Sequence, residues 1–289
     1  MKQITTLQKV LNFFVVKILV ALSFCISIVI LVQLGLSKLL ALTSISKEEK
    51  ILWVGIAVAL FSVSTYVFLF RFYEKRNIIE LSTKKLTQNL LVGISLGVGL
   101  QSLTILVIYL KGGFTVSSVN SITLVLPSFV MAFTSAIFEE ILFRGIVFRI
   151  TEEKLGSYWA LLISALIFGA MHLANPHSSI GAALGLAIQA GLLLAAAYIF
   201  ARNLWFPIAI HFAWNFTQSG IFGVSTSGSN MGKSFLTTKI EGAAWFTGGQ
   251  FGPEGSIQAT LFCLTATIVL MLLNYRQHKL MARFRRVKK

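Results

Sequence analysis

The chain has 289 residues, of which 56% are hydrophobic and only 12% are charged. A soluble domain of this length carries about a quarter charged residues, so the composition excludes an ordinary soluble globular protein. All ten acidic residues are glutamates, and the absence of aspartate excludes Ser-His-Asp triads, paired-aspartate proteases and EF-hand calcium loops. The two cysteines, Cys25 and Cys263, lie within apolar runs, which excludes a disulfide framework and a CxxC metal site.

Apolar windows of roughly the length that crosses a bilayer, about 20 residues, follow one another along the chain. The first is too long for the core of a signal peptide and lacks an Ala-x-Ala exit, so we expect it to be retained. The sequence therefore predicts an all-α polytopic membrane protein of about eight transmembrane helices, with residues 1–289 forming a single integral membrane domain. The windows are 18–36, 51–70, 90–110, 124–148, 158–173, 180–201, 205–221 and 257–273.

The distribution of Lys and Arg predicts the orientation of these spans. Of the 25 basic residues, Arg144 lies inside a span, 18 lie on the side that carries both termini, and six lie on the other side. Because positive residues collect in cytoplasmic loops, both termini are predicted to be cytoplasmic. Residues 275–289 then form a basic cytoplasmic tail and residues 221–256 an extracytoplasmic loop. We expect anionic lipids at the basic side and no nucleic acid, because the tail does not resemble a platform on which bases stack.

The fourth predicted span carries three charged residues, Glu139, Glu140 and Arg144. Each charged group in lipid costs roughly 2.5 to 3.5 kcal/mol on the insertion scale, so the cluster indicates a function or close pairing. Residues four apart share a helix face, so we expect Arg144 to reach back to Glu140. Glu139 lies about 140° away from Arg144 around the helix and faces elsewhere. We predict that Glu139 performs proton chemistry while Glu140 and Arg144 brace the helix.

Two of the four histidines lie within predicted spans. His172 follows Phe168 by four residues, and His211 precedes Asn215 by four, so each pair shares one helix face. A single histidine in a membrane helix often serves packing alone. Two histidines, an amide and an unpaired glutamate are together enough to hold a water, polarise a carbonyl and stabilise an oxyanion.

At these residues the sequence resembles the CPBP (CAAX protease and bacteriocin-processing, or Abi) family of intramembrane endopeptidases. The family motifs Glu-Glu-x-x-x-Arg, Phe-x-x-x-His and His-x-x-x-Asn/Asp stand here as EEILFR at 139–144, FGAMH at 168–172 and HFAWN at 211–215. Each motif is weak alone, but three in order on successive predicted spans are fairly specific. The resemblance covers a catalytic core of about residues 125–220.

The resemblance implies peptide-bond hydrolysis within the membrane, by a polytopic endopeptidase of the bacterial cytoplasmic membrane. Its expected partner is a protein or peptide substrate, which the resemblance allows to be lipidated. Glu139 would activate a water with His172, while His211 and Asn215 would stabilise the oxyanion. Beside these four, the expected catalytic set includes Glu140, with Arg144 and Phe168 as supports of the pocket.

No cofactor is expected, although zinc stays open. The His-x-x-x-Asn pair offers one strong ligand, whereas catalytic zinc sites favour three protein ligands. If a metal is present, the resemblance assigns it to Glu139, His172 and His211. The chain has no His-Glu-x-x-His motif, so the zinc helix of that class of metalloprotease is absent.

Other functions use the same polar residues and remain open from sequence alone. The charges of the fourth span would form a simple ion cluster at a helix end if they reached the cytoplasmic surface, although apolar residues continue past Arg144. A non-enzymatic immunity or scaffold protein would use the cluster only to lock helices together, and a proton-coupled transporter would use a glutamate as a relay. The segment Gly93–Gly97 fits small-x-x-x-small helix packing and also the Gly-x-Ser-x-Gly pattern of serine hydrolases, which would make Ser95 a nucleophile.

One geometric question stays open. At 1.5 Å per residue, His172 lies about 22 Å into its predicted span, whereas His211 lies only about six residues into its own. For the two histidines to meet Glu139, the helices must tilt, the span of His172 must start elsewhere, or the chain must re-enter near Asn175 and Pro176.

Overall fold

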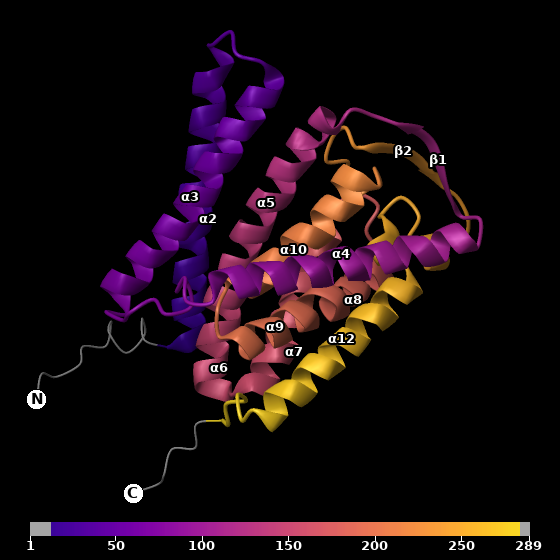
Figure 1. Cartoon of the computed structure of the whole chain (residues 1–289). Helices are drawn as coiled ribbons and strands as arrows, with labels where there is room; N and C mark the ends of the chain where they lie inside the picture. The colour runs from indigo at the N-terminus through magenta and orange to yellow at the C-terminus, as the bar shows by residue number, and fades with distance from the viewer. Residues whose placement is uncertain (1–12, 284–289) are drawn as a thin grey trace, which may run out of the picture.

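The computed structural model describes residues 13–283, so Lys2, Lys9 and the basic residues after Arg283 lie outside the described part of the chain. The described residues form a bundle of α-helices with one small sheet at one end (Figure 1). This confirms the prediction of an all-α polytopic architecture.

Seven helical segments in the described part of the chain have the length and apolar character of membrane spans. The eighth predicted window forms the shorter helix α10 (Trp205–Phe216), which continues into the π-helical segment η5 (Thr217–Ile221). Three of the seven are single helices from the start of the chain, namely α2 (Phe14–Ala41), α3 (Lys47–Tyr73) and α4 (Leu86–Leu110). The remaining four are Ile122–Leu155, Ser157–Ala174, Ile180–Ala201 and Ile257–Arg276.

Those four spans contribute most of the main hydrophobic core, and three of them change helix type along their length. Their parts, in chain order, are η1 (Ile122–Val125), α5 (Leu126–Glu140), η2 (Ile141–Phe148), α6 (Arg149–Leu155), α7 (Ser157–Met171), η3 (His172–Ala174), α8 (Ile180–Leu186), η4 (Ala187–Leu192), α9 (Leu193–Ala201) and α12 (Ile257–Arg276). Both η2 and η4 are π-helical, a form that is rare and frequent at functional sites.

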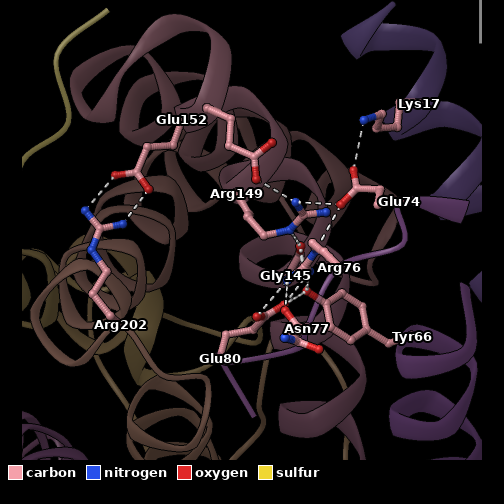
Figure 2. Close-up of polar contacts among 11 residues, drawn as sticks. Lys17, Tyr66, Glu74, Arg76, Asn77, Glu80, Gly145, Arg149, Glu152 and Arg202 are labelled. Carbon is pink, nitrogen blue, oxygen red and sulfur yellow. Dashed lines mark hydrogen bonds and ion pairs between the residues drawn. The ribbon is translucent and has the colours of Figure 1, made fainter. Parts of the chain in front are cut away.

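One end of the bundle is held together by a network of ion pairs (Figure 2). Glu74, just after α3, pairs at 3.0 Å with Lys17 of α2 and at 3.0 Å with Arg149 of α6. Arg202, just after α9, pairs with Glu152 of α6 at 2.5 Å. Lys17, Arg149 and Arg202, which are predicted to lie on one side of the membrane, thus lie at one end of the bundle, called the basic end below. The cytoplasmic location of this end stays a prediction.

The opposite end carries the sheet and the long loop. Strand β1 (Phe114–Val119) pairs antiparallel with β2 (Leu236–Ile240), with Phe114 opposite Ile240 and an irregularity between Val116 and Ser118. The loop also contains two short helical turns, α11 (Ala244–Thr247) and η6 (Pro253–Gly255). The sequence pattern predicts none of these elements.

Helices α4 and α10 approach closely at two glycines. A Cβ atom on Gly97 would lie 2.4 Å from the carbonyl oxygen of Ile210, and one on Gly93 would lie 2.7 Å from Cβ of Ala209. The packing role predicted for this pair is therefore confirmed. Ser95, between them, is exposed on α4 and does not line the cavity described below, so the structure offers no support for the serine-nucleophile alternative.

Candidate active site

The two glutamates of the first motif occupy the last two positions of α5, directly before the π-helical η2. The side chain of Glu140 is fully buried and accepts a hydrogen bond of 2.7 Å from Nη1 of Arg144. Arg144 also donates through Nη2 to the carbonyl oxygens of Ala190 (2.6 Å) and Gly191 (3.2 Å) in η4. The ion pair expected from the four-residue spacing is thus present, and it joins two helices at their π-helical segments.

Glu140 also contacts His211 of α10. Its Oε1 atom lies 2.9 Å from Nδ1 of His211. Because a carboxylate only accepts hydrogen bonds, Nδ1 carries the hydrogen, and in the neutral ring Nε2 is left as an acceptor. That Nε2 atom lies 4.0 Å from Oε2 of Glu139. Glu140 therefore sets the tautomer and the direction of the ring that faces Glu139.

His172 is oriented in the same way by a different group. It is the first residue of η3, and its Nδ1 atom lies 2.8 Å from the carbonyl oxygen of Phe168, one turn earlier. The hydrogen is again on Nδ1, because a carbonyl oxygen only accepts, and Nε2 lies 4.0 Å from Oε2 of Glu139. The Phe168 ring packs on the His172 ring at 4.6 Å and on the Arg144 guanidinium at 5.1 Å.

The start of α10 resolves the question of depth. Glu139 lies about 24 Å from Leu155 along its helix, and His172 about 22 Å from Ser157 along the next one, so these two residues are level. The turn before α10 is packed into the bundle. Leu204 there is fully buried, and its N–H bonds to the carbonyl oxygen of buried Glu80. Helix α10 therefore begins at a buried position, and from it the His211 side chain reaches Glu139 and Glu140.

These side chains surround a cavity of about 220 Å³. Glu139 is a quarter exposed, yet its Oε2 atom is buried and has no hydrogen-bond partner. Asn215 lies one turn after His211, and its Nδ2 atom is 3.5 Å from Oγ of Ser135. Neither Glu140 nor Arg144 lines the cavity. The lining residues that carry polar groups are Ser135, Glu139, His172, Asn175, Gln189, His211, Trp214, Asn215, Thr226, Ser227, Ser229 and Glu254.

The last four of these come from the outer loop, to which the sequence analysis gave no role. The side chain of Glu254 is buried, and its carboxylate accepts hydrogen bonds from Oγ of Ser227 (2.6 Å) and Nε2 of Gln218 (2.6 Å). Burial raises the pKa of the Glu254 carboxyl, and the bonds from Ser227 and Gln218 offset this only in part. A glutamate within a glycine-rich loop gives no hydrophobic pattern from which such burial is predicted.

The spacing of the candidate metal ligands does not fit a zinc ion. Zinc binds histidine nitrogen at about 2.0 to 2.1 Å and carboxylate oxygen at about 2.0 to 2.2 Å. Tetrahedral ligands at those distances are about 3.4 Å apart, whereas both Nε2 atoms lie 4.0 Å from Oε2 of Glu139. Among the residues that the structure describes, no three His, Cys, Asp or Glu side chains are placed to hold a metal ion.

Comparison with known proteins finds two similarities. The model of the "Type II CAAX prenyl endopeptidase Rce1-like" family matches residues 121–217, which include all three motifs. A Bacillus subtilis (strain 168) protein described as "Putative membrane peptidase YdiL" is 34% identical over 88 residues. That alignment covers 30% of this chain and 33% of the relative, so the likeness concerns about a third of each protein. No solved structure matches the chain.

The matched segment contains the long helix with Glu139 and Glu140, the helix with His172, and α10 with His211 and Asn215. The segment that matches the family therefore includes the helices that carry the polar site. The apolar helices describe a multi-pass membrane protein. In this segment the chain is similar to the type II CAAX prenyl endopeptidase Rce1-like family, and over about a third of its length it is similar to a putative membrane peptidase.

Proposed function

We propose that the protein is an intramembrane endopeptidase that hydrolyses a peptide bond of a membrane-associated or lipidated protein or peptide. The observation that carries the proposal is the position of Glu139. Its unpartnered Oε2 atom lies 4.0 Å from the Nε2 atoms of both His172 and His211, on the wall of an internal cavity. The family match adds that proteins sharing this segment include membrane peptidases.

The gap between Glu139 and each histidine suits one water molecule. A water oxygen makes hydrogen bonds of about 2.8 Å. When its two partners are 4.0 Å apart, the angle at the water is about 90°, close to the angle between its two O–H bonds. A water in this position beside His172 donates one hydrogen to Glu139 and the other to the bare Nε2 of His172. Both partners are acceptors, so the site is suited to taking a proton from water.

The proposed reaction follows from this arrangement. Glu139 takes a proton as the water oxygen attacks the peptide carbonyl, and it returns that proton to the leaving amine nitrogen. His172 orients the water through its Nε2 atom. In this proposal His211 carries a hydrogen on both ring nitrogens throughout, and its Nε2–H together with Nδ2 of Asn215 stabilises the negative charge on the carbonyl oxygen. Glu140, bonded to Nδ1 of His211, compensates the positive charge that this ring carries.

The same proposal assigns water activation to the glutamate without a metal. Both Nε2 atoms lie 4.0 Å from Oε2 of Glu139, wider than the about 3.4 Å between tetrahedral zinc ligands and wide enough for a water, which supports this assignment. No step in the reaction above needs a Lewis acid, because Glu139 supplies the base and Asn215 and His211 supply the oxyanion donors.

A second hollow fits the apolar part of a lipidated substrate. It lies between α2, α3 and α5, has a volume of about 610 Å³, and is lined mostly by apolar residues. Met131 and Ser135 line both this hollow and the cavity with Glu139. A peptide whose lipid chain lies in this second hollow would therefore place its polar part in the cavity with Glu139.

We also propose that anionic lipids bind at the basic end of the bundle, on the cytoplasmic side of the bacterial membrane. Lys84, Lys85, Arg202 and Lys279 line one hollow of about 720 Å³ that has no acidic lining residue. Among the described residues, none of these three lysines forms an ion pair. The protein should bind vesicles that contain phosphatidylglycerol more tightly than neutral vesicles. The double variant Lys84→Gln, Lys85→Gln should reduce this difference in binding. The exposed control Lys154→Gln should reduce it less.

The proposed activity is tested with the purified protein in lipid nanodiscs. The protein is incubated with a panel of prenylated and unprenylated fluorogenic peptides. Cleavage products identified by mass spectrometry are expected, with the bond broken at one position. A transporter would instead produce a substrate-dependent pH change in proteoliposomes without cleavage. A scaffold protein would do neither, and either result would contradict the proposal.

A further inference from the structure

The outer loop folds back onto the catalytic cavity. Thr226, Ser227 and Ser229 belong to one tight turn, closed by paired hydrogen bonds between Thr226 and Ser229, and all three line the cavity. The turn stands on the side of the cavity away from the basic end of the bundle.

Glu254 contacts this turn through hydrogen bonds of its carboxylate. Its carboxylate accepts hydrogen bonds from the N–H of Ser227, from Oγ of Ser227 and from Nε2 of Gln218. Gln218 also donates to the carbonyl oxygen of Ser225 at 2.6 Å, and Nε2 of Gln189 donates to the carbonyl oxygen of Glu254 at 2.7 Å. Glu254 is 1% exposed, and no cation in the described part of the chain forms an ion pair with it. A buried carboxylate is costly, so its three donors indicate a specific positioning role.

The turn is also tied to the segment that follows His172. The carbonyl oxygen of Ser227 accepts a hydrogen bond of 3.0 Å from Nδ2 of Asn175, and the N–H of Asn175 bonds to the carbonyl oxygen of His172. Ser227 is thus bonded on one side to Glu254 and on the other to the end of the helix that carries His172. A displacement of the turn would move the anchor of His172.

Two glycines show how closely the turn is packed. Gly228 has a φ of +78°, and a Cβ atom there would lie 1.7 Å from the carbonyl oxygen of Pro176. Gly252 has a φ of +119°, and a Cβ atom there would lie 2.2 Å from the carbonyl oxygen of Ser225. The backbone on both sides of the turn approaches more closely than any side chain permits, so the turn has one tightly defined position.

We propose that Glu254 is a positioning residue whose carboxylate latches the turn 225–229 against the segment 172–176, which closes the cavity toward the outer loop and holds His172 in place. The effect on His172 rests on the proposed peptidase activity. The closure of the cavity does not, and it has a readout of its own.

Cys263 supplies that readout. It lines the cavity, is 1% exposed, and becomes the only cysteine of the chain once Cys25 is replaced by Ser. In this background Cys263 is treated with a water-soluble, positively charged methanethiosulfonate reagent. The rate of its modification measures how easily the reagent enters the cavity. Glu254→Gln keeps the size of the side chain but loses one acceptor, because its amide group faces either Ser227 or Gln218 as a second donor. Glu241→Gln is the matched control, since Glu241 lies in the same loop and its side chain is 67% exposed.

Modification of Cys263 is expected to be at least about tenfold faster in Glu254→Gln than in the parent, and unchanged within about twofold in Glu241→Gln. The cleavage rate kcat should fall about 10- to 100-fold in Glu254→Gln, with a smaller change in KM, because a misplaced catalytic group mainly affects the chemical step.

Asn175→Ala should also reduce kcat. The double variant should be less impaired than the product of the two single effects, since both changes break one chain of contacts.

Equal modification rates in Glu254→Gln and the parent would overturn the latch. Faster modification with unchanged kcat would overturn the link to His172 while leaving the closure standing. If the parent protein cleaves no peptide, the modification rates still decide the latch, so failure of the proposed activity is distinguishable from failure of this proposal. Ser227→Ala, which removes one donor and keeps the backbone N–H, provides the same comparison if Glu254→Gln does not fold.

Discussion

Oε1 of Glu140 lies 2.9 Å from Nδ1 of His211 and, at the same time, 2.7 Å from Nη1 of Arg144. One buried carboxylate therefore orients a histidine of the site and neutralises a fully buried guanidinium. The adjacent Glu139 has neither partner and faces the cavity. Two neighbouring glutamates thus have separate surroundings, which predicts that substitutions at the two positions have separate consequences.

Substitution of Glu140 by Gln should mainly affect stability. Removal of one member of a buried ion pair leaves the other charge uncompensated, which costs about 3 to 5 kcal/mol. The amide oxygen can still accept from Nδ1 of His211, so part of the activity should remain, about 1 to 10% of the parent rate. Thermal unfolding in detergent and the cleavage rate measure the two effects. A Glu140→Gln protein as stable as the parent would contradict the role of this ion pair.

Substitution of Gly97 by Ala should disturb the packing of α4 on α10 next to the site. The new Cβ atom would lie 2.4 Å from the carbonyl oxygen of Ile210, the residue before His211. We expect a loss of about 1 to 3 kcal/mol of unfolding free energy, with reduced activity. Gly99→Ala is the matched control, because no atom lies within 4 Å of a Cβ there. Equal stability of the two variants would refute the close approach.

Stability should fall in acid because of the ion network at the basic end (Figure 2). Burial alone would raise the pKa of Glu74, but Arg149 and Lys17 outweigh it and hold that pKa below its ordinary value of 4.5. Burial likewise opposes the hydrogen bonds from Arg76 and Tyr66 to Glu80, which hold its pKa below 4.5. Because both values are lowered on folding, their stabilisation is present above pH 4.5 and is lost as the pH falls through the folded-state values.

Unfolding temperatures measured between pH 7 and pH 3 check this prediction. Glu74→Gln and Glu80→Gln should each lower the unfolding temperature at pH 7 and flatten its decline below pH 4.5. The exposed Glu241→Gln should leave both unchanged. A parent protein whose unfolding temperature rises as the pH falls from 5 to 3 would show that the network does not stabilise the fold.

Metal chelation should leave the activity intact. Preincubation with EDTA or 1,10-phenanthroline is expected to change the cleavage rate by less than about twofold, since the separations around Glu139 do not suit zinc. Magnesium-saturated EDTA controls for effects of the chelator on the lipid. Loss of activity that added zinc restores would contradict the metal-free reaction.

The helices and the Glu140–Arg144 pair are predictable from sequence because they depend on local patterns. Apolar windows specify spans, and a four-residue spacing specifies a shared helix face. The depth of His211 is not predictable in this way, since it depends on buried Leu204 resting on the segment around Glu80. The burial of Glu254 is equally hidden, because its donors, Ser227 and Gln218, are 27 and 36 residues away in the chain.

The central claim is that Glu139 activates the water, and the cleavage rate of Glu139→Gln tests it most directly. We measure cleavage of one identified peptide by the parent, by Glu139→Gln and by the control Glu153→Gln, which changes a half-exposed glutamate of α6. Glu139→Gln should lose at least about 1,000-fold in kcat with an unchanged unfolding temperature, and Glu153→Gln should keep parent-like activity. Parent-like cleavage by Glu139→Gln would contradict this claim.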